Sequence, residues 1–361
     1  MFVIFDTNLL FFKMAYAIVS RKSSMGSFSQ QLIKSIILNI SYILKGVPGN
    51  VYPIFCFDSA TERSWRYKIK EAADIFSYKG NRKRDYPFDK NEVIKAMDIF
   101  KESINFKYGL MLHRAGMEGD DMIYVVNRIA QSMGMSSIIV SSDKDMMQLV
   151  KSRKHPYTCV LNSNQDKTIY YTAEGNNETN TDDYMDLFDD SKGIEQYVTD
   201  IEVQIDPNKH LFIKILTGDN SDSIPSVVRN TNDVIKKKGL GQVKASKVWE
   251  YFKCSDVQEK LLNPDFVKNV AKQILSQAGS LDHNMIEIVI NNINTNIKMM
   301  MLHDSVYDSY IDLETLTTDI IADIDKWLKS VDNSDIMEWR QFGVLKDTAY
   351  GVESNNYIEY E

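Results

Sequence analysis

Residues 136–150 read "SSIIVSSDKDMMQLV": an apolar run typical of a buried strand, two aspartates one residue apart (Asp143 and Asp145), and a second apolar run. One interpretation is that Asp143 merely caps a following helix, because a side-chain oxygen there accepts an unpaired backbone N–H. The other is that the two carboxylates carry chemistry. The rest of the chain has to decide between these two interpretations.

Two earlier apolar runs also end in an aspartate. They are "FVIFD" at residues 2–6 and "YPIFCFD" at residues 52–58, which end at Asp6 and Asp58. Helical periodicity occupies much of the remaining chain up to the third run, from about residue 8 and over residues 28–45, 90–104 and 118–134. Strands that alternate with helices predict an α/β fold with a mostly parallel central sheet flanked by helices.

The second half of the chain changes character twice. Residues 157–205 are less regular, with a predicted hairpin ("YTCVLN" and "KTIYYT") and an insertion at 174–190 that holds seven carboxylates and no base. From Asp206 onward the pattern is almost entirely helical. We predict a core over residues 1–205, a second region over 206–255, and a helical C-terminal region with a polar tail over 256–361.

The composition is ordinary for a globular protein: 361 residues, 43% hydrophobic and 25% charged. No apolar stretch reaches the roughly 18 residues of a membrane span, so we expect no membrane partner. Asp6, Asn8 and Lys13 interrupt the apolar N-terminus, which favours a buried strand and helix over a signal peptide. The three cysteines are widely separated and lack metal-binding spacing, so we expect a reducing, cytoplasmic setting.

The net charge of −8 argues, as an average, against a nucleic-acid-binding protein. The charge is segregated, however. Residues 63–84 hold eight basic and two acidic side chains, and residues 236–247 hold five lysines and no acid. Such blocks indicate separate surfaces with separate partners.

Ligands of open α/β sheets bind beyond the carboxyl ends of the strands, so carboxylates at three strand ends should meet in one crevice. Two further acidic clusters, "EGDD" (118–121) and "GDNSD" (218–222), add to this group. With Asp145 the candidates are nine: Asp6, Asp58, Glu118, Asp120, Asp121, Asp143, Asp145, Asp219 and Asp222.

Nine carboxylates cannot share a crevice unaided, because two like charges ~4 Å apart repel by about 4 kcal/mol at an effective dielectric near 20. Oxygen ligands without His or Cys favour Mg²⁺, with Mn²⁺ as a substitute. A calcium loop counted from Asp143 fails, because Gln148 and Lys154 stand where it needs Gly and Glu. So many carboxylates predict two ions, the arrangement used for in-line phosphoryl displacement.

The ordered motifs "VIFDTN", "FDS…WRYK…YKGNR", "GMEGDD", "SSDKDMMQL", "LTGDNSDSIPSV" and "GLGQVKASKVWEYF" resemble those of the structure-specific 5′-nucleases. This family includes flap endonucleases, the 5′-nuclease domain of bacterial DNA polymerase I, and phage 5′-exonucleases of the RNase H type. The resemblance covers about residues 1–255. It implies a PIN-like 5′-nuclease core with a helical arch and a helix–hairpin–helix in the helical C-terminal part.

The resemblance also implies two sets of metal ligands. The first ion would be surrounded by Asp6, Asp58, Glu118, Asp120 and Asp143. The second would be held by Asp143, Asp145, Asp219 and Asp222. Asp121 belongs to the same metal site as an outer neighbour of the ligands, and Asp143 and Asp145 then act as a ligand pair.

The basic segment at about 60–90 resembles the arch that receives a single-stranded 5′ end. In relatives a Lys and an Arg, here Lys79 and Arg82, clamp the scissile phosphate, and a Tyr, here Tyr78, stacks on a base. Further expected nucleic-acid contacts are Arg66, Lys83 and Arg84. The alternative is a solvated basic helix.

The segment "GLGQVKASKVW" resembles a helix–hairpin–helix turn. Glycines let the backbone approach a duplex phosphate, and the helix N-terminus presents N–H groups to it. The residues concerned are Gly239, Gly241, Lys244 and Lys247. Residues 227–238 are an insertion relative to the compact family pattern, so a K⁺ ion at this turn stays an open alternative.

The resemblance implies a divalent-metal-dependent 5′→3′ nuclease that removes RNA primers or 5′ flaps, with Lys79, Arg82, Asp143 and Asp145 as catalytic residues. Its substrates would be branched or nicked DNA and RNA–DNA hybrids with a 5′ end. A single-strand-binding protein or a clamp is a candidate partner of the C-terminal helices. One alternative is a DNA-structure-binding protein without catalysis. A phosphatase that uses Asp-x-Asp is disfavoured, because the first strand ends in Asp6-Thr7-Asn8.

Overall fold

The computed structural model describes residues 1–21, 27–47, 49–59, 64–69, 78–79, 85–152, 155–164, 167–173, 201–229, 231, 240–277 and 282–331. The acidic insertion at 174–190, most of the basic arch segment and Gly239 lie outside these residues, as do Arg82, Lys83 and Arg84. Within the described ranges, no helix combines the length and the apolar character that crossing a membrane requires.

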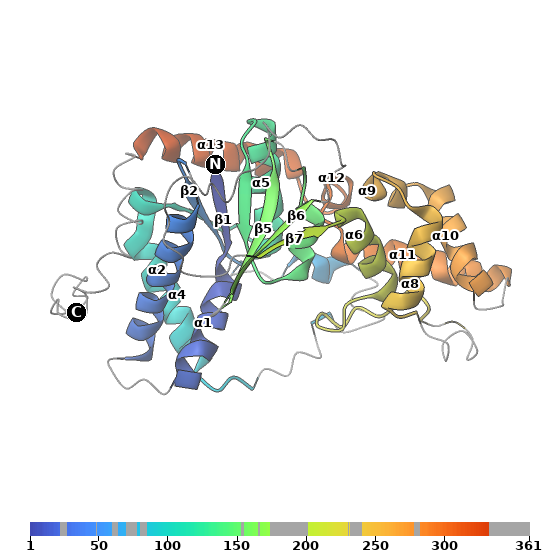
Figure 1. The fold of residues 1–361 in the computed structure, drawn as a ribbon, viewed down its shortest axis with the longest axis horizontal. Coiled ribbons are helices and arrows are strands. Elements are labelled where there is room, and N and C mark those ends of the chain that lie inside the picture. The colour runs from blue at the N-terminus through green and yellow to red at the C-terminus, as the bar shows by residue number, and fades with distance from the viewer. Residues whose placement is uncertain are drawn as a thin grey trace.

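The centre of the molecule is a seven-stranded sheet in the order β3-β2-β1-β4-β5-β6-β7 (Figure 1). Its strands are β1 (Phe2–Asp6), β2 (Tyr52–Cys56), β3 (Leu110–Leu112), β4 (Ser137–Val140), β5 (Thr158–Asn164), β6 (Lys167–Ala173) and β7 (Ile201–Ile205). Every neighbouring pair is parallel except the β5–β6 hairpin. The mostly parallel sheet and the hairpin are as predicted, whereas β3 and β7 were not predicted.

Strand β1 explains why the sequence shows a continuous apolar run rather than an alternation. All five of its residues are buried. Phe2 and Ile4 face one hydrophobic cluster, and Val3 and Phe5 face the other. A parallel strand covered by helices on both faces has no solvent-facing side, so it needs apolar residues throughout.

Among the described residues, three helices cover the face of the sheet that Val3 and Phe5 line: α1 (Thr7–Arg21), α2 (Phe28–Gly46) and α4 (Lys90–Tyr108). Helix α2 begins at a capping box in which Ser27 and Gln30 satisfy each other's backbone N–H groups. Its residues Leu32, Ile36 and Ile40, four apart, are fully buried against the sheet.

The other face carries α5 (Gly119–Ser132) and the C-terminal helices (Figure 1). Two 3₁₀ helices follow strand ends on this side, η1 (Trp65–Lys68) and η2 (Lys144–Leu149). The remaining helices are α6 (Pro207–Thr217), α8 (Gln242–Phe252), α9 (Val257–Leu261), α10 (Pro264–Gln277), α11 (His283–Met300), α12 (Asp304–Tyr307) and α13 (Leu313–Ser330).

Helix α13 brings the chain back from the helical end to the sheet (Figure 1). Trp327 of α13 packs edge-to-face on Tyr52 of β2, with ring centroids 6.1 Å apart, and Asp323 pairs with Arg114 at 2.5 Å. One hydrophobic cluster runs from Phe2 to Trp327. The core therefore continues across both predicted boundaries, and the described C-terminal helices are part of it.

Candidate active site

The three strand-end aspartates lie at one edge of the sheet, as the parallel order requires. Asp6 ends β1, Asp58 follows β2, and Asp143 follows β4. Asp143 also caps η2, since its side chain accepts the backbone N–H of Asp145 at 2.9 Å. The capping interpretation is therefore right about the geometry, although the same carboxylate also interacts electrostatically with Asp6.

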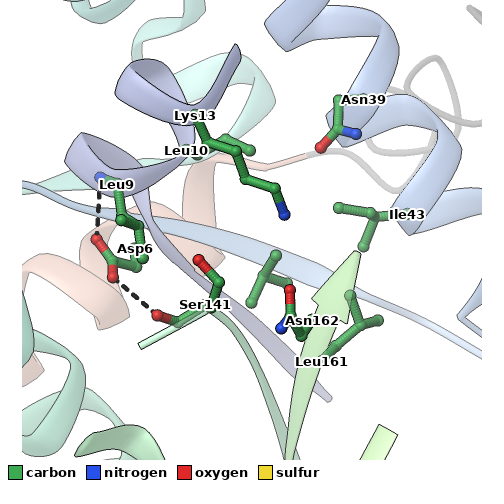
Figure 2. Close-up of a pocket in the computed structure, with 11 residues that line it drawn as sticks. Asp6, Leu9, Leu10, Lys13, Asn39, Ile43, Ser141, Leu161 and Asn162 are labelled. Carbon is green, nitrogen blue, oxygen red and sulfur yellow. Dashed lines mark hydrogen bonds between the residues drawn. The ribbon is translucent and has the colours of Figure 1, made fainter. Parts of the chain in front are cut away.

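Asp6 is held by two neutral donors at the wall of a small pocket (Figure 2). Its oxygens accept the backbone N–H of Leu9 at 3.2 Å and the hydroxyl of Ser141 at 2.8 Å. Burial, together with the charges of Asp58 and Asp143, outweighs the hydrogen bonds from Ser141 and Leu9 and raises the pKa of Asp6 to about 7. No positive charge balances this carboxylate in these contacts.

Asp58 is fixed from two directions. One oxygen accepts the backbone N–H of Gly119 at 2.7 Å, and the other accepts the amide of Asn8 at 3.1 Å. Asn8 in turn accepts the backbone N–H of Asp58 at 3.2 Å, which makes the pairing reciprocal. A Cβ atom at position 119 would stand 3.3 Å from the Asp58 carboxylate, so the glycine permits this close approach.

Asp120 and Glu118, at the start of α5, have pKa values that are shifted in opposite directions. Burial, together with the charges of Asp143 and Asp6, raises the pKa of Asp120 well above its ordinary value. Burial acts on Glu118 in the same direction, but the charges of Arg66 and Lys79 outweigh it, so the pKa of Glu118 is lowered. Glu118 is thus the ionised, paired member of the group.

A lysine that was not predicted from the sequence lies between two members of the second predicted ligand set. Lys214, in the last turn of α6, forms ion pairs with Asp145 and, at 2.9 Å, with Asp219. Burial alone would raise the pKa of Asp219, but Lys214 and hydrogen bonds from Ser221 lower it to about 2. Asp222 lies in the turn that the Asp219–Ile224 bridge closes, and its backbone carbonyl accepts the N–H of Lys79 at 3.0 Å.

Two of the predicted nucleic-acid contacts, Arg66 and Tyr78, have a different environment from the one expected. Arg66 is only 4% exposed, and its guanidinium pairs with Glu118 and Asp121 inside the protein. Tyr78 is 5% exposed and donates its hydroxyl to Glu118 at 3.1 Å, so its ring does not present a stacking surface. Asp121, predicted as an outer neighbour of the ligands, is fully buried among four hydrogen-bond donors, one of which is the backbone N–H of Glu118.

Lys79 is a predicted phosphate-binding residue that lies at the carboxylates in the described part of the chain. It adopts a left-handed backbone with φ 56°, and its ammonium group pairs with Glu118. The ammonium also lies 5.0 Å from the centre of the Tyr78 ring. Lys79 therefore stands at the border between the acidic site and the basic segment.

The carboxylate oxygens gathered at this site are of the kind that binds a divalent cation. Asp6, Asp58 and Asp120 are buried carboxylates whose pKa values are all raised, burial being the first cause of each shift, and mutual repulsion adds to it. A cation between them would remove that repulsion, and oxygen ligands suit Mg²⁺ or Mn²⁺. In the described part of the chain, however, no three acidic, His or Cys side chains are already arranged to hold a metal ion.

The predicted duplex-binding turn is described from Leu240 onward. Gly241 caps α8 in an extended conformation, with φ −86° and ψ 176°. Lys244 and Lys247 lie exposed in the first two turns of this helix, and Gly241 supplies no side-chain cap. This arrangement suits phosphate contact.

Comparison with known proteins agrees with this fold. Residues 1–180 match the family model described as "5'-3' exonuclease, N-terminal resolvase-like domain". The chain belongs to the 5′-nuclease superfamily. The T5 5′-exonuclease, in a structure described with divalent metal ions (zinc) bound, shares the fold with a TM-score of 0.52 at 14% identity, over 89% of this chain and 98% of that one.

Two curated members of the superfamily show partial similarity. The 5'-3' exonuclease of Mycoplasma pneumoniae is 26% identical over 154 residues, which are 43% of each chain. The DNA polymerase I of Caldicellulosiruptor bescii is 23% identical over 278 residues, which are 77% of this chain and 27% of the polymerase. The matched region is therefore less than half the length of either relative.

Proposed function

We propose that this chain is a divalent-metal-dependent 5′→3′ nuclease that hydrolyses phosphodiester bonds in replication intermediates. The observation that carries the proposal is the meeting of Asp6, Asp58, Asp120 and Asp143 at one sheet edge. There the charges of Asp58 and Asp143 help to raise the pKa of Asp6, and those of Asp143, Asp6 and Asp58 help to raise the pKa of Asp120. Such a set is stable in its ionised form only beside a multiply positive group. Membership of the 5′-nuclease superfamily supports the same reading.

The residues that would hold the ions form two groups. Asp6, Asp58, Glu118, Asp120 and Asp143 would hold the first, and Asp143, Asp145, Asp219 and Asp222 the second. When bound, Mg²⁺ supplies Lewis-acid activation of water and charge neutralisation at the phosphate. The chain itself contributes rigid placement, because Ser141 and Leu9 orient Asp6, and Asn8 and Gly119 orient Asp58.

Substrate binding is assigned to two basic regions. Lys79 would exchange its partner Glu118 for the scissile phosphate as the substrate enters, and Arg82 would act beside it. Gly239, Gly241, Lys244 and Lys247 would bind the duplex backbone, with K⁺ as a further candidate ligand of that turn. The substrate class is then nucleic acid with a duplex and a free 5′ end.

The finer proposal is an RNase H and flap endonuclease type of activity on RNA primers and 5′ flaps. It rests on the order of motifs in the sequence. Product lengths from 5′-flap DNA, nicked DNA and an RNA–DNA hybrid decide it. Short products from the hybrid support RNase H activity, and cleavage restricted to flap DNA contradicts it.

The test of the main proposal uses a fluorescent 5′-flap DNA with Mg²⁺. The wild-type chain should cleave it, and Asp120→Asn should reduce kcat at least 100-fold, because a buried ligand position loses its charge. Asp98→Asn is the control, since Asp98 is 60% exposed on α4 and should leave kcat unchanged. Flap binding without turnover by the wild type in Mg²⁺ or Mn²⁺ would instead indicate a non-catalytic DNA-structure-binding protein.

A further inference from the structure

Arg66 uses all three sides of its guanidinium group inside the protein. Its Nη1 pairs with Glu118 Oε2 at 3.1 Å, and its Nη2 pairs with Asp121 Oδ1 at 2.7 Å. Its Nε donates to the backbone carbonyl of Met299, 233 residues away, at 3.1 Å. One buried side chain therefore connects a proposed metal ligand to the C-terminal end of α11.

Asp121 keeps Arg66 in this position. Its Oδ1 also accepts the hydroxyl of Tyr307 at 2.8 Å, and its Oδ2 accepts Trp65 Nε1 at 3.1 Å. The backbone N–H of Glu118 donates to the same Oδ2 at 2.9 Å. Because a buried carboxylate with this many donors has little freedom to turn, it fixes η1, α5 and α12 to one another.

The two oxygens of Glu118 have different partners. Oε2 accepts Arg66 and the hydroxyl of Tyr78, each at 3.1 Å, whereas Oε1 pairs with the ammonium of Lys79. A lysine ammonium exchanges partners more readily than a guanidinium held on three sides. Arg66 thus sets which oxygen of Glu118 stays available.

A second side chain makes the same connection on the other side of the site. Gln148 Nε2 donates to the carbonyls of Met300 and Asp145, both at 3.0 Å, and Gln148 Oε1 accepts the N–H of Leu302 at 2.9 Å. Residues 299–302 are therefore attached to Glu118 through Arg66 and to the backbone of Asp145 through Gln148. We call this stretch the 299–302 strap.

We propose that Arg66 and Gln148 are positioning residues through which the 299–302 strap orients the carboxylates of both proposed metal sites. The C-terminal helices would then be a working part of the active site rather than an appended docking module. This inference rests on the proposed nuclease function, because it assigns Glu118 and Asp145 to metal binding. Partners of a ligand in its outer shell commonly change metal affinity 10–100-fold when substituted.

The test measures Mn²⁺ binding to the full chain without nucleic acid, by the spin-resonance signal of free Mn²⁺. Arg66→Lys keeps the charge but cannot hold both carboxylates and Met299, and Gln148→Met removes the amide at similar length. Each should weaken Mn²⁺ binding about 10–100-fold. The matched control is Arg128→Lys, which also touches the C-terminal helices, through Asp304 at 2.5 Å, but no proposed ligand. It should change the affinity less than about twofold.

The measurement separates this inference from the proposed function. A wild type that binds Mn²⁺ and cleaves, with both variants matching it in Mn²⁺ affinity, overturns the inference alone. Variants that melt at lower temperature but bind Mn²⁺ like the wild type below their transition also overturn it, because the strap would then be only structural. A wild type that neither binds Mn²⁺ nor cleaves overturns both. If Arg66→Lys does not fold, Gln148→Met decides.

Discussion

At the scale of single residues, the two halves of the site deal with negative charge in opposite ways. Asp6 has neutral hydrogen-bond partners, Ser141 and Leu9, and its pKa is raised to about 7 by burial and by neighbouring carboxylates. Asp219 has the ammonium of Lys214 beside it, which outweighs burial and lowers its pKa to about 2. In the first half the carboxylates repel one another, and a bound cation would relieve that repulsion. In the second half the ammonium group of Lys214 already balances the negative charge.

The first prediction concerns pH. The folded chain keeps a proton on Asp6 up to about pH 7, whereas in the unfolded chain Asp6 loses it near its ordinary value of 3.8. A group whose pKa is raised on folding makes stability fall as the pH rises through this window. In EDTA, the melting temperature should therefore fall from about pH 4 to about pH 7, with a smaller slope for Asp6→Asn.

Adding Mg²⁺ at pH 7.5 should raise the melting temperature of the wild type, because a ligand that binds only the folded state stabilises it. The same addition should have a smaller effect on Asp6→Asn. An identical pH slope in wild type and Asp6→Asn contradicts the assignment of the shift to Asp6.

The second prediction concerns Lys214. Lys214→Met leaves Asp145 and Asp219, both under 20% exposed, without their cation. Breaking such a buried pair costs about 3 kcal/mol, so the free energy of unfolding in EDTA should fall by roughly that amount. Urea denaturation measures it, and Mg²⁺ should recover part of the loss.

Lys209→Met is the control for Lys214→Met on the same helix. Lys209 pairs with Glu250, but the two side chains are 41% and 59% exposed, so the loss should stay below about 1 kcal/mol. Equal losses for the two variants would show that Lys214 is not in a buried acidic site.

At the scale of elements, α8 is the part of the molecule best placed to bind a duplex. Its first two turns carry Lys244 and Lys247, and Gly241 leaves the helix start open, with no atom within 4 Å of the place where a Cβ would be. The positive end of the helix and the two lysines then act on the same phosphates.

The third prediction follows from this element. Lys244→Glu combined with Lys247→Glu should weaken binding of duplex DNA at least tenfold and reduce the slope of log K against log salt by about 2, because two phosphate contacts are lost. Lys253→Glu, at the other end of α8, is the control and should leave the slope nearly unchanged. Fluorescence anisotropy at several salt concentrations gives both values. An unchanged slope in the double variant contradicts the proposed duplex site.

At the scale of the whole molecule, the C-terminal helices first lead away from the sheet and then return to it. Helices α6 to α11 extend the core away from the sheet, and α13 returns to pack on β2 (Figure 1). Leu275, Ile293 and Ile324 are buried in the cluster that also contains Ile4. These helices are therefore part of the hydrophobic core, and removing them would expose it to solvent.

The fourth prediction is a truncation. A chain that ends at residue 254 loses Met299, Tyr307 and Trp327, so it exposes the sheet face they cover. It also removes the Met299 carbonyl from Arg66 and the Tyr307 hydroxyl from Asp121. We expect an aggregating or unfolded product, measured by circular dichroism and light scattering. A chain that ends at Val331 keeps all of these contacts and is the control. Cooperative unfolding of the shorter chain near the wild-type temperature would contradict this view of the core.

The sequence alone determined the features that depend on neighbouring residues. Apolar runs that end in Asp6, Asp58 and Asp143, separated by helical periodicity, were enough for the parallel sheet and for its acidic edge, because strand and helix periods are local. The three-residue strand β3 was too short to show a pattern, and β7 follows the irregular stretch beside the acidic insertion. Local signals were missing there, so these strands were not predicted.

Only the tertiary structure decided which charged groups meet. From the sequence, Arg66 was expected to contact nucleic acid and Asp121 to belong to the metal site. Long-range packing against Met299 and Tyr307 buries both side chains. It also placed Lys214 between Asp145 and Asp219, which no spacing indicates. The physical reason is that a charge takes its role from the desolvation and the partners that folding brings to it, and these come from residues far away along the chain.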